Sequence, residues 1–162
     1  MRTLCLLFCL LLAACGGGDK PALNVGDAAP AFSGPQLDGP TFALAAGGRG
    51  QPLVIRFWAD WCRYCEGEMR SIEPVYQQYR NRGLTVLAIN AGQDRATVAA
   101  FIARLGISYP VLLDEDAAIA RRYAVVGLPT TYFVDPAGVV RAKLVGEADA
   151  ATFERHVRAL LP

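Results

Sequence analysis

Long apolar runs alternate with amphipathic segments along the chain, and this pattern predicts strands and helices in turn. Residues 52–59 (PLVIRFWA) and 84–90 (LTVLAIN) are apolar and rich in β-branched and aromatic residues, as strands buried on both faces are. Between them, residues 62–82 are expected to form a helix. Pro74 falls inside this helix and is expected to kink it, and Gly83 is expected to end it.

The second half of the chain continues the alternation. Asp94 is expected to cap a helix whose apolar residues recur at helical spacing, namely Val98, Phe101, Ile102 and Leu105. Residues 109–114 are expected to be extended, and residues 115–125 to form a brief helix. Two strands, 130–135 and 139–146, are joined by the turn sequence PAG.

Asp149 is expected to cap a last helix with its apolar side inward: Phe153, Val157 and Leu160. Near the N-terminus, residues 25–40 are rich in Gly, Pro and Asp and should run over the surface with short extended pieces. Residues 41–44 are a short strand candidate. The order of elements implies one domain over residues 23–162, with a mixed sheet and helices on both of its faces.

The first residues predict export. The apolar run from Leu4 to Leu12 is too short to span a bilayer, as signal-peptide cores are. The sequence Leu-Ala-Ala-Cys at residues 12–15 resembles the bacterial lipobox, which predicts a signal peptide over residues 1–14 and a lipid on Cys15. Residues 15–22 would then be a flexible tether, and the domain would face the periplasm of a bacterial cell envelope. The alternative is an ordinary secretory signal.

Composition and charge narrow the function. With 162 residues the chain is long enough for one well-packed domain. Sixteen basic and fifteen acidic residues give a net charge of +1, so the sequence supplies no electrostatic basis for a nucleic-acid partner.

Export also changes the count of cysteines. Of the five, Cys5 and Cys9 would leave with the signal peptide and Cys15 would carry lipid, so only Cys62 and Cys65 remain as thiols. A disulfide that spans only two intervening residues closes a very small loop and therefore adds little to the stability of a fold. A structural zinc site needs four ligands, and the chain adds only one distant histidine, His156, which we expect to be an ordinary surface or boundary residue. We therefore predict a redox couple and no metal.

The positions of the two cysteines suggest their roles. At a helix N-terminus the positive partial charge favours thiolate, which is the attacking species in disulfide exchange. Cys62 comes first and is expected to be the more exposed sulfur, hence the nucleophile. Cys65 would resolve the mixed disulfide.

The motif FWADWCRYC, followed by VVGLPTTYFVD, resembles the active site of thioredoxin-like proteins. More narrowly, the chain resembles the membrane-anchored TlpA/ResA-like thiol–disulfide oxidoreductases, with VGDAAPAF as its N-terminal entry. The resemblance implies an α/β thioredoxin-like three-layer sandwich: a mixed central sheet flanked by helices, with an N-terminal extension and a TlpA-type central insert. It also implies that the disulfide serves without any other cofactor.

The same resemblance implies roles for further residues. Trp61, Leu128 and Pro129 would bind the substrate. Pro129 would be cis and lie against the disulfide, turning the Leu128 backbone toward an incoming chain, whereas the alternative is a trans turn. Glu68 would shuttle the proton that Cys65 loses, whereas the alternative is a solvated helix glutamate.

Three positions depart from the family pattern. Arg63 and Tyr64 stand between the cysteines, where these proteins most often have a proline beside the second one. Met69 is followed by Arg70 instead of the usual kink proline. Arg56 occupies the strand position of a buried Asp in thioredoxins.

A guanidinium in a covered strand needs a partner. We therefore hypothesise that Arg56 pairs with Glu68 or another carboxylate and raises the potential of the thiols; the alternative is that it reaches water along the sheet. Arg63 and Arg56 favour the thiolate and Glu68 opposes it. The sequence therefore does not tell whether their combined effect raises or lowers the reduction potential.

The resemblance implies a reductant of exported proteins with cysteines, such as apocytochromes c, that is itself re-reduced by a membrane thiol donor. An oxidase or isomerase is one alternative, suggested only by the dipeptide Arg63-Tyr64 between the cysteines. A thioredoxin-like binding module without catalysis is another. A peroxiredoxin-type peroxidase shares the VGDAAPAF entry, but its Pro-x-x-x-Thr-x-x-Cys motif is absent.

Overall fold

The structure is a computed structural model that describes residues 22–161. The expected signal peptide (1–14), the expected lipid site at Cys15 and all but the last residue of the tether lie outside this range. Within residues 22–161, no helix combines the length and the hydropathy needed to cross a membrane.

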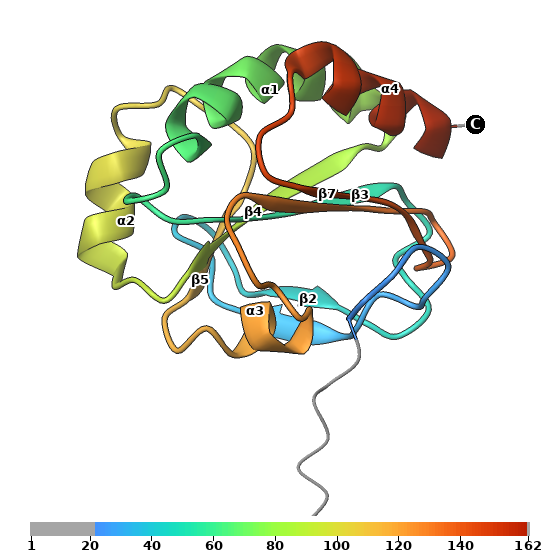
Figure 1. Cartoon of the computed structure of the whole chain (residues 1–162), viewed down its shortest axis with the longest axis horizontal. Helices are drawn as coiled ribbons and strands as arrows, with labels where there is room; N and C mark the ends of the chain where they lie inside the picture. The colour runs from blue at the N-terminus through green and yellow to red at the C-terminus, as the bar shows by residue number, and fades with distance from the viewer. Residues whose placement is uncertain (1–21, 162) are drawn as a thin grey trace, which may run out of the picture.

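A five-stranded sheet forms the middle of the molecule, in the order β5-β4-β3-β6-β7 (Figure 1). Its strands are β3 (Leu53–Trp58), β4 (Thr85–Ala91), β5 (Val111–Asp114), β6 (Thr130–Val134) and β7 (Val140–Val145). β3, β4 and β5 run parallel, and β6 and β7 pair antiparallel. The mixed sheet expected from the order of elements is confirmed.

The central strand β3 is buried along its whole length. Its alternate side chains enter two separate hydrophobic cores. Val54 and Trp58 belong to the core that also holds both cysteines, while Ile55 and Phe57 belong to the core on the other face. Because both faces are covered, the strand reads as a continuous apolar run, and Arg56 is the only charged residue in it.

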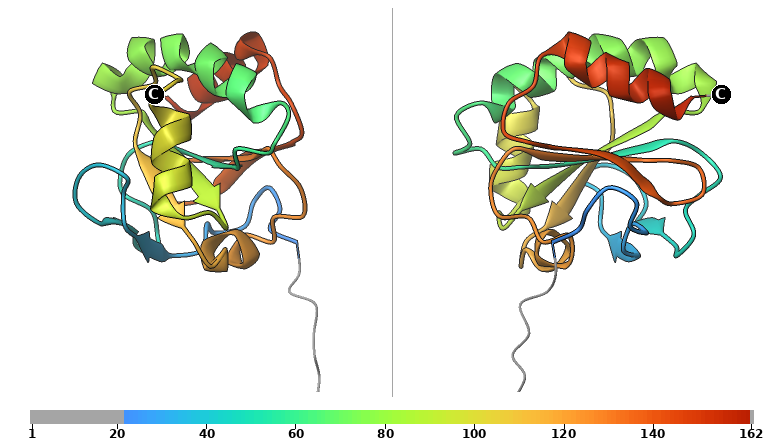
Figure 2. Two further views of the ribbon diagram at one scale, coloured as in Figure 1. Left: turned by 90° about the vertical axis from the view of Figure 1, so that its left-hand side faces the viewer. Right: turned by 45° about the vertical axis from the view of Figure 1, so that its right-hand side comes forward.

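Helices α1 (Cys65–Tyr79) and α4 (Ala150–Leu160) cover one face of the sheet, and the short helix α3 (Ala118–Arg122) lies on the other (Figures 1 and 2). α2 (Arg95–Ile102) lies by the β4–β5 side of the sheet and contributes Val98 and Phe101 to the core beneath α1. The arrangement is the three-layer sandwich that was expected.

The N-terminal extension packs on the same face as α3. β1 (Phe32–Gly34) and β2 (Phe42–Leu44) pair antiparallel, and Phe32 and Phe42 stack with ring centroids 5.9 Å apart. Ahead of them, the N–H of Gly26 donates to the carbonyl of Val140 at 2.8 Å, which fastens this segment to the edge strand β7.

Several boundaries differ from the prediction. α1 begins at Cys65 rather than Cys62, because residues 60–64 form turns. It continues through Pro74, and a 3₁₀ turn, η1 (Arg80–Arg82), leads to Gly83, whose φ of 90° ends the helical segment as expected. β5 begins two residues later than predicted, and the brief helix is confined to residues 118–122.

Candidate active site

Cys62 and Cys65 form a disulfide between the end of β3 and the first residue of α1. The Sγ atoms are 2.04 Å apart, and the N–H of Cys65 donates to the carbonyl of Cys62 at 3.0 Å. Cys62 is 6% exposed and Cys65 is fully buried. Cys62 is therefore the more exposed of the two cysteines, as predicted.

The helix start lies between the two cysteines rather than before them. Tyr64 is the N-cap residue of α1, so Cys65 is the first helical residue and Cys62 precedes the cap by two positions. Free N–H groups of the first turn still place positive partial charge near both sulfurs, which favours thiolate. Glu66 and Glu68 lie in the same turn and oppose this effect.

Exposed apolar side chains stand beside the cysteines in the sequence and in the loop before Pro129. Trp61 is 70% exposed, Tyr64 is 46% exposed, and Val126, in the loop before Pro129, is 91% exposed. The Arg63 guanidinium lies 5.6 Å from the centre of the Tyr64 ring. The sequence did not single out Val126, because an apolar residue among other apolar residues looks like a core residue. The one indication was its position close to Leu128 and Pro129 in the chain.

The Leu128–Pro129 peptide bond is cis, as predicted. β6 starts at the next residue, Thr130, which pairs with Phe57 of β3, so the register places Pro129 beside the end of the strand that leads to the cysteines. The Thr130 hydroxyl donates to the carbonyl of Gly127 at 2.7 Å, which holds the turn. Leu128 packs against the core that contains both cysteines.

A buried ion pair joins β3 to α1. Arg56 Nη1 lies 2.6 Å from Glu68 Oε1 and also donates to the Thr131 hydroxyl at 3.2 Å. Arg56 is fully buried and Glu68 is 3% exposed. The predicted pairing is confirmed, and two alternatives are wrong: Arg56 does not reach water, and Glu68 is not a solvated helix residue.

This pair leaves several polar atoms without hydrogen-bond partners in the described part of the chain: Arg56 Nε and Nη2, and Glu68 Oε2. Tyr109 lies near enough to feel both charges. Burial raises its pKa, Arg56 lowers it and Glu68 raises it, with burial dominant. Its hydroxyl donates to the Met69 carbonyl at 2.8 Å, so Tyr109 is held as a neutral hydrogen-bond donor.

A second polar network was not predicted. Gln93 Oε1 accepts from the backbone N–H of Asp60 at 2.9 Å and from Asn90 Nδ2 at 2.8 Å, and Gln93 Nε2 donates to the Asp60 carboxylate. This clamp fixes the residue before Trp61 to the end of β4. The sequence feature that could have indicated this network is Asn90, a polar residue at the end of a buried strand.

No cluster of three or more His, Cys, Asp or Glu side chains within residues 22–161 could hold a metal ion. His156 lies on α4, half-buried, with its ring 4.9 Å from that of Phe133, and burial lowers its pKa. It is a boundary residue, as expected.

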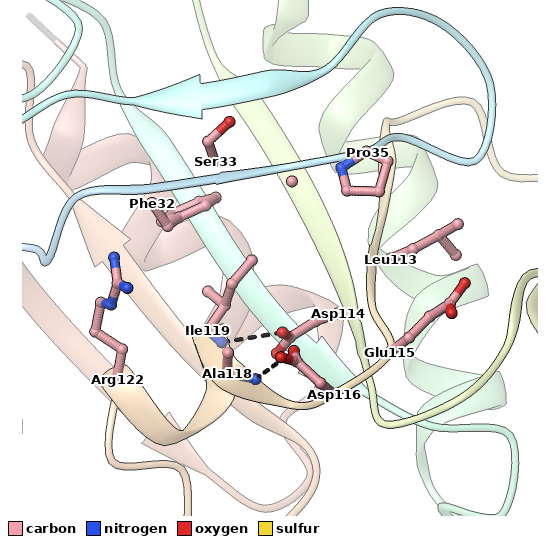
Figure 3. A pocket seen from close by; sticks show the side chains of 11 residues that line it. Phe32, Ser33, Pro35, Leu113, Asp114, Glu115, Asp116, Ala118, Ile119 and Arg122 are labelled. Carbon is pink, nitrogen blue, oxygen red and sulfur yellow. Dashed lines mark hydrogen bonds between the residues drawn. The ribbon is translucent and has the colours of Figure 1, made fainter.

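A hollow of about 500 Å³ lies between β1, the end of β5 and α3 (Figure 3). None of the predicted site residues lines it. Two of its carboxylates have structural partners: Asp114 accepts from the N–H groups of Ile119 and Ala120, and Asp116 accepts from that of Ala118. The hollow is therefore separate from the disulfide and is built around the start of α3.

Comparison with known proteins agrees with this geometry. Residues 25–143 match the model of the AhpC/TSA family. The thiol-disulfide oxidoreductase ResA of Geobacillus kaustophilus is 34% identical over 100% of this chain and 95% of its own length. ResA of Bacillus subtilis is 27% identical over 88% of this chain and 79% of its own.

Among solved structures, a putative thiol:disulfide interchange protein DsbE from Chlorobium tepidum is similar with a TM-score of 0.80 and 27% identity. The match covers 87% of this chain and 100% of the other. The predicted thioredoxin-like fold is confirmed.

Proposed function

Because the chain belongs to the AhpC/TSA family and is a thioredoxin-like thiol–disulfide oxidoreductase, we propose that it reduces disulfides of exported proteins at a bacterial membrane. The observation that carries the proposal is the Cys62–Cys65 disulfide at the start of α1, in which Cys62 is 6% exposed and Cys65 is fully buried.

The reaction has two exchange steps. The Cys62 thiolate attacks one sulfur of a client disulfide, which forms a mixed disulfide and releases the first client thiolate. Cys65 then loses its proton and attacks Cys62 Sγ, which releases the second client thiolate and closes the Cys62–Cys65 disulfide. Two electrons pass to the client, and the protein is left in the oxidised form seen in the structure.

The surroundings support roles for the neighbouring residues. The exposed Trp61 ring offers an apolar contact to the client, and the backbone of Leu128 next to cis Pro129 offers hydrogen bonds to an extended segment. Glu68 follows Cys65 by one helical turn and has one oxygen without a partner. We assign it the proton that Cys65 loses.

The cellular setting rests on the sequence. An exported chain with a lipid on Cys15 would face the periplasm and stay at the membrane, close to a membrane thiol donor that returns its electrons. Client proteins with cysteines, such as apocytochromes c awaiting haem, are the proposed substrates.

Insulin reduction tests the activity. The wild-type protein with a dithiol donor is expected to reduce insulin disulfides, and Cys62→Ser is expected to abolish turnover. Cys65→Ser should accumulate the mixed disulfide with the client, because no sulfur remains to resolve it. A wild-type protein that binds clients without reducing insulin, and whose binding survives Cys62→Ser, would indicate a binding module. Turnover that survives Cys62→Ser would overturn the proposed mechanism.

The direction of electron flow is tested by the reduction potential of the pair. A value near about −270 mV, as in thioredoxin, supports a reductant, and a value near about −120 mV supports an oxidase. An oxidase or isomerase is the second candidate because Tyr64 and Arg63 separate the cysteines and Arg63 favours the thiolate.

A further inference from the structure

We propose that Arg56 is a positioning residue of the redox site: it orients Glu68 and offsets its charge, so that the two together set the reduction potential of Cys62–Cys65. The inference rests on the proposed function and deepens it. It assigns a role to a buried cation that the exchange steps do not themselves use.

The geometry places the cation on the cysteine side of the sheet. Along β3, Val54 and Trp58 enter the core shared with both cysteines, and Arg56 lies between them on the same face. Its Nη1 contacts Glu68 Oε1 at 2.6 Å, and Thr131 of β6 accepts from the same nitrogen. These two contacts fix the guanidinium between β3, β6 and α1.

The position of Glu68 couples this pair to the thiols. Cys65 and Glu68 are three residues apart in α1, so their side chains share one helix face, with Cβ atoms about 5–6 Å apart. Both charges of the pair are shielded from water, since Arg56 is fully buried and Glu68 is 3% exposed. Their effects on a nearby thiolate are therefore weakly screened.

The two charges act on the reduced form with opposite signs. A cation near the reduced cysteines stabilises thiolate, hence the reduced form, and makes the couple more oxidising; a carboxylate does the reverse. Arg56 pairs with one oxygen of Glu68 and leaves Oε2 without a partner. The cation thus neutralises the carboxylate while leaving one oxygen free for the Cys65 proton.

The test is the equilibrium of the cysteine pair with glutathione, measured for the wild type, Arg56→Met, Glu68→Gln and the double variant. Arg56→Met should make reduction about tenfold less favourable, which is about 30 mV more negative. Glu68→Gln should make it about tenfold more favourable. The double variant should lie within about threefold of the wild type, because both charges are gone.

Two controls separate charge from packing. Arg141→Met makes the same change at a 57% exposed arginine that pairs with Asp135, near the β6–β7 turn and away from the cysteines, and should leave the potential unchanged. Arg56→Lys keeps a cation and should stay within about threefold of the wild type. Circular dichroism shows whether each variant is folded.

The inference is overturned if the two single variants shift the potential in the same direction, or if neither shifts it more than about threefold. If Arg56→Met does not fold, Glu68→Gln and Arg56→Lys decide: only the first should change the potential. Failure of the proposed function looks different: insulin reduction by the wild type would then be absent or would not depend on Cys62, whatever potential the pair shows with glutathione.

Discussion

At the scale of single residues, Arg56 shows how a departure from an apolar pattern carries information. A charge in the middle of a fully covered strand is tolerated only with a partner, so the sequence predicts an ion pair. The partner is Glu68, twelve residues further along the chain. Whether Arg56 would meet that carboxylate or water depended on how α1 packs over β3, which the local sequence does not contain.

Trp61 is the residue whose role is most directly testable. We expect Trp61→Ala to lower kcat/KM for a protein disulfide at least fivefold, because large exposed aromatic side chains dominate contacts with partners. Reduction of a small disulfide such as dithiobis(nitrobenzoate) should stay within about twofold, since such a substrate needs the two cysteines but little contact beyond them. Steady-state kinetics with both substrates measure the difference.

Val25→Ala is the matched control. Val25 is also an exposed apolar residue, 60% exposed, but the segment it begins is tied to β7 near Val140 and not to the disulfide. It should leave both rates unchanged. If Trp61→Ala lowered kcat/KM equally for the protein disulfide and the small disulfide, Trp61 would instead act on the cysteines themselves.

At the scale of elements, helix caps were predicted well and helix starts near the site were not. Asp94 and Asp149 were expected as caps, and their carboxylates accept from the N–H groups of Thr97 and Thr152. A cap is set by residues within one turn, so local sequence suffices. α1 starts at Cys65 because the residues before it form turns, with the N–H of Cys62 bonded to the Ala59 carbonyl and that of Cys65 to the Cys62 carbonyl, and Gln93 holds Asp60 of this loop across 33 residues.

The cap of α4 gives a prediction about pH. The Thr152 N–H lowers the pKa of Asp149 below its ordinary value of 3.8. A lowered pKa stabilises the fold above 3.8, and this contribution is lost as the pH falls through the folded-state value. Asp149→Ala should therefore lower Tm by about 2–4 °C at pH 7, with a difference that shrinks at lower pH.

Asp149→Asn tests whether the charge of the carboxylate causes this pH dependence of stability. Asn keeps an oxygen that can accept from Thr152 but has no titrating proton, so its Tm should stay close to that of the wild type at pH 7. Differential scanning calorimetry at pH 7 and pH 3 measures both variants. If Asp149→Ala lost more stability at pH 3 than at pH 7, the cap would not work through its carboxylate.

At the scale of the whole molecule, folding and redox chemistry are linked. If the folded pair is more reducing than the same pair in the unfolded chain, the oxidised protein must be the more stable form, by about 1.4 kcal/mol for every 30 mV. For a reductant we therefore expect a higher free energy of unfolding with the disulfide closed than with it reduced. For an oxidase the order reverses.

Urea denaturation with and without a dithiol measures this difference. Cys62→Ser cannot close the disulfide, so its stability should not respond to the dithiol and provides the control. A reduced form more stable than the oxidised form would contradict the proposed direction of electron flow, while leaving the exchange chemistry itself intact.

Local sequence was enough to predict the sheet strands, the two helix caps, the pairing of Cys62 with Cys65 and, through the family motif, the cis proline. These follow from local periodicity, from short spacings and from a family motif carried by neighbouring residues. Tertiary structure decided the partner of Arg56, the Gln93 clamp and the exposure of Trp61 and Val126. Each of these depends on segments distant in the chain, because burial and charge pairing exist only once strands and helices have packed together.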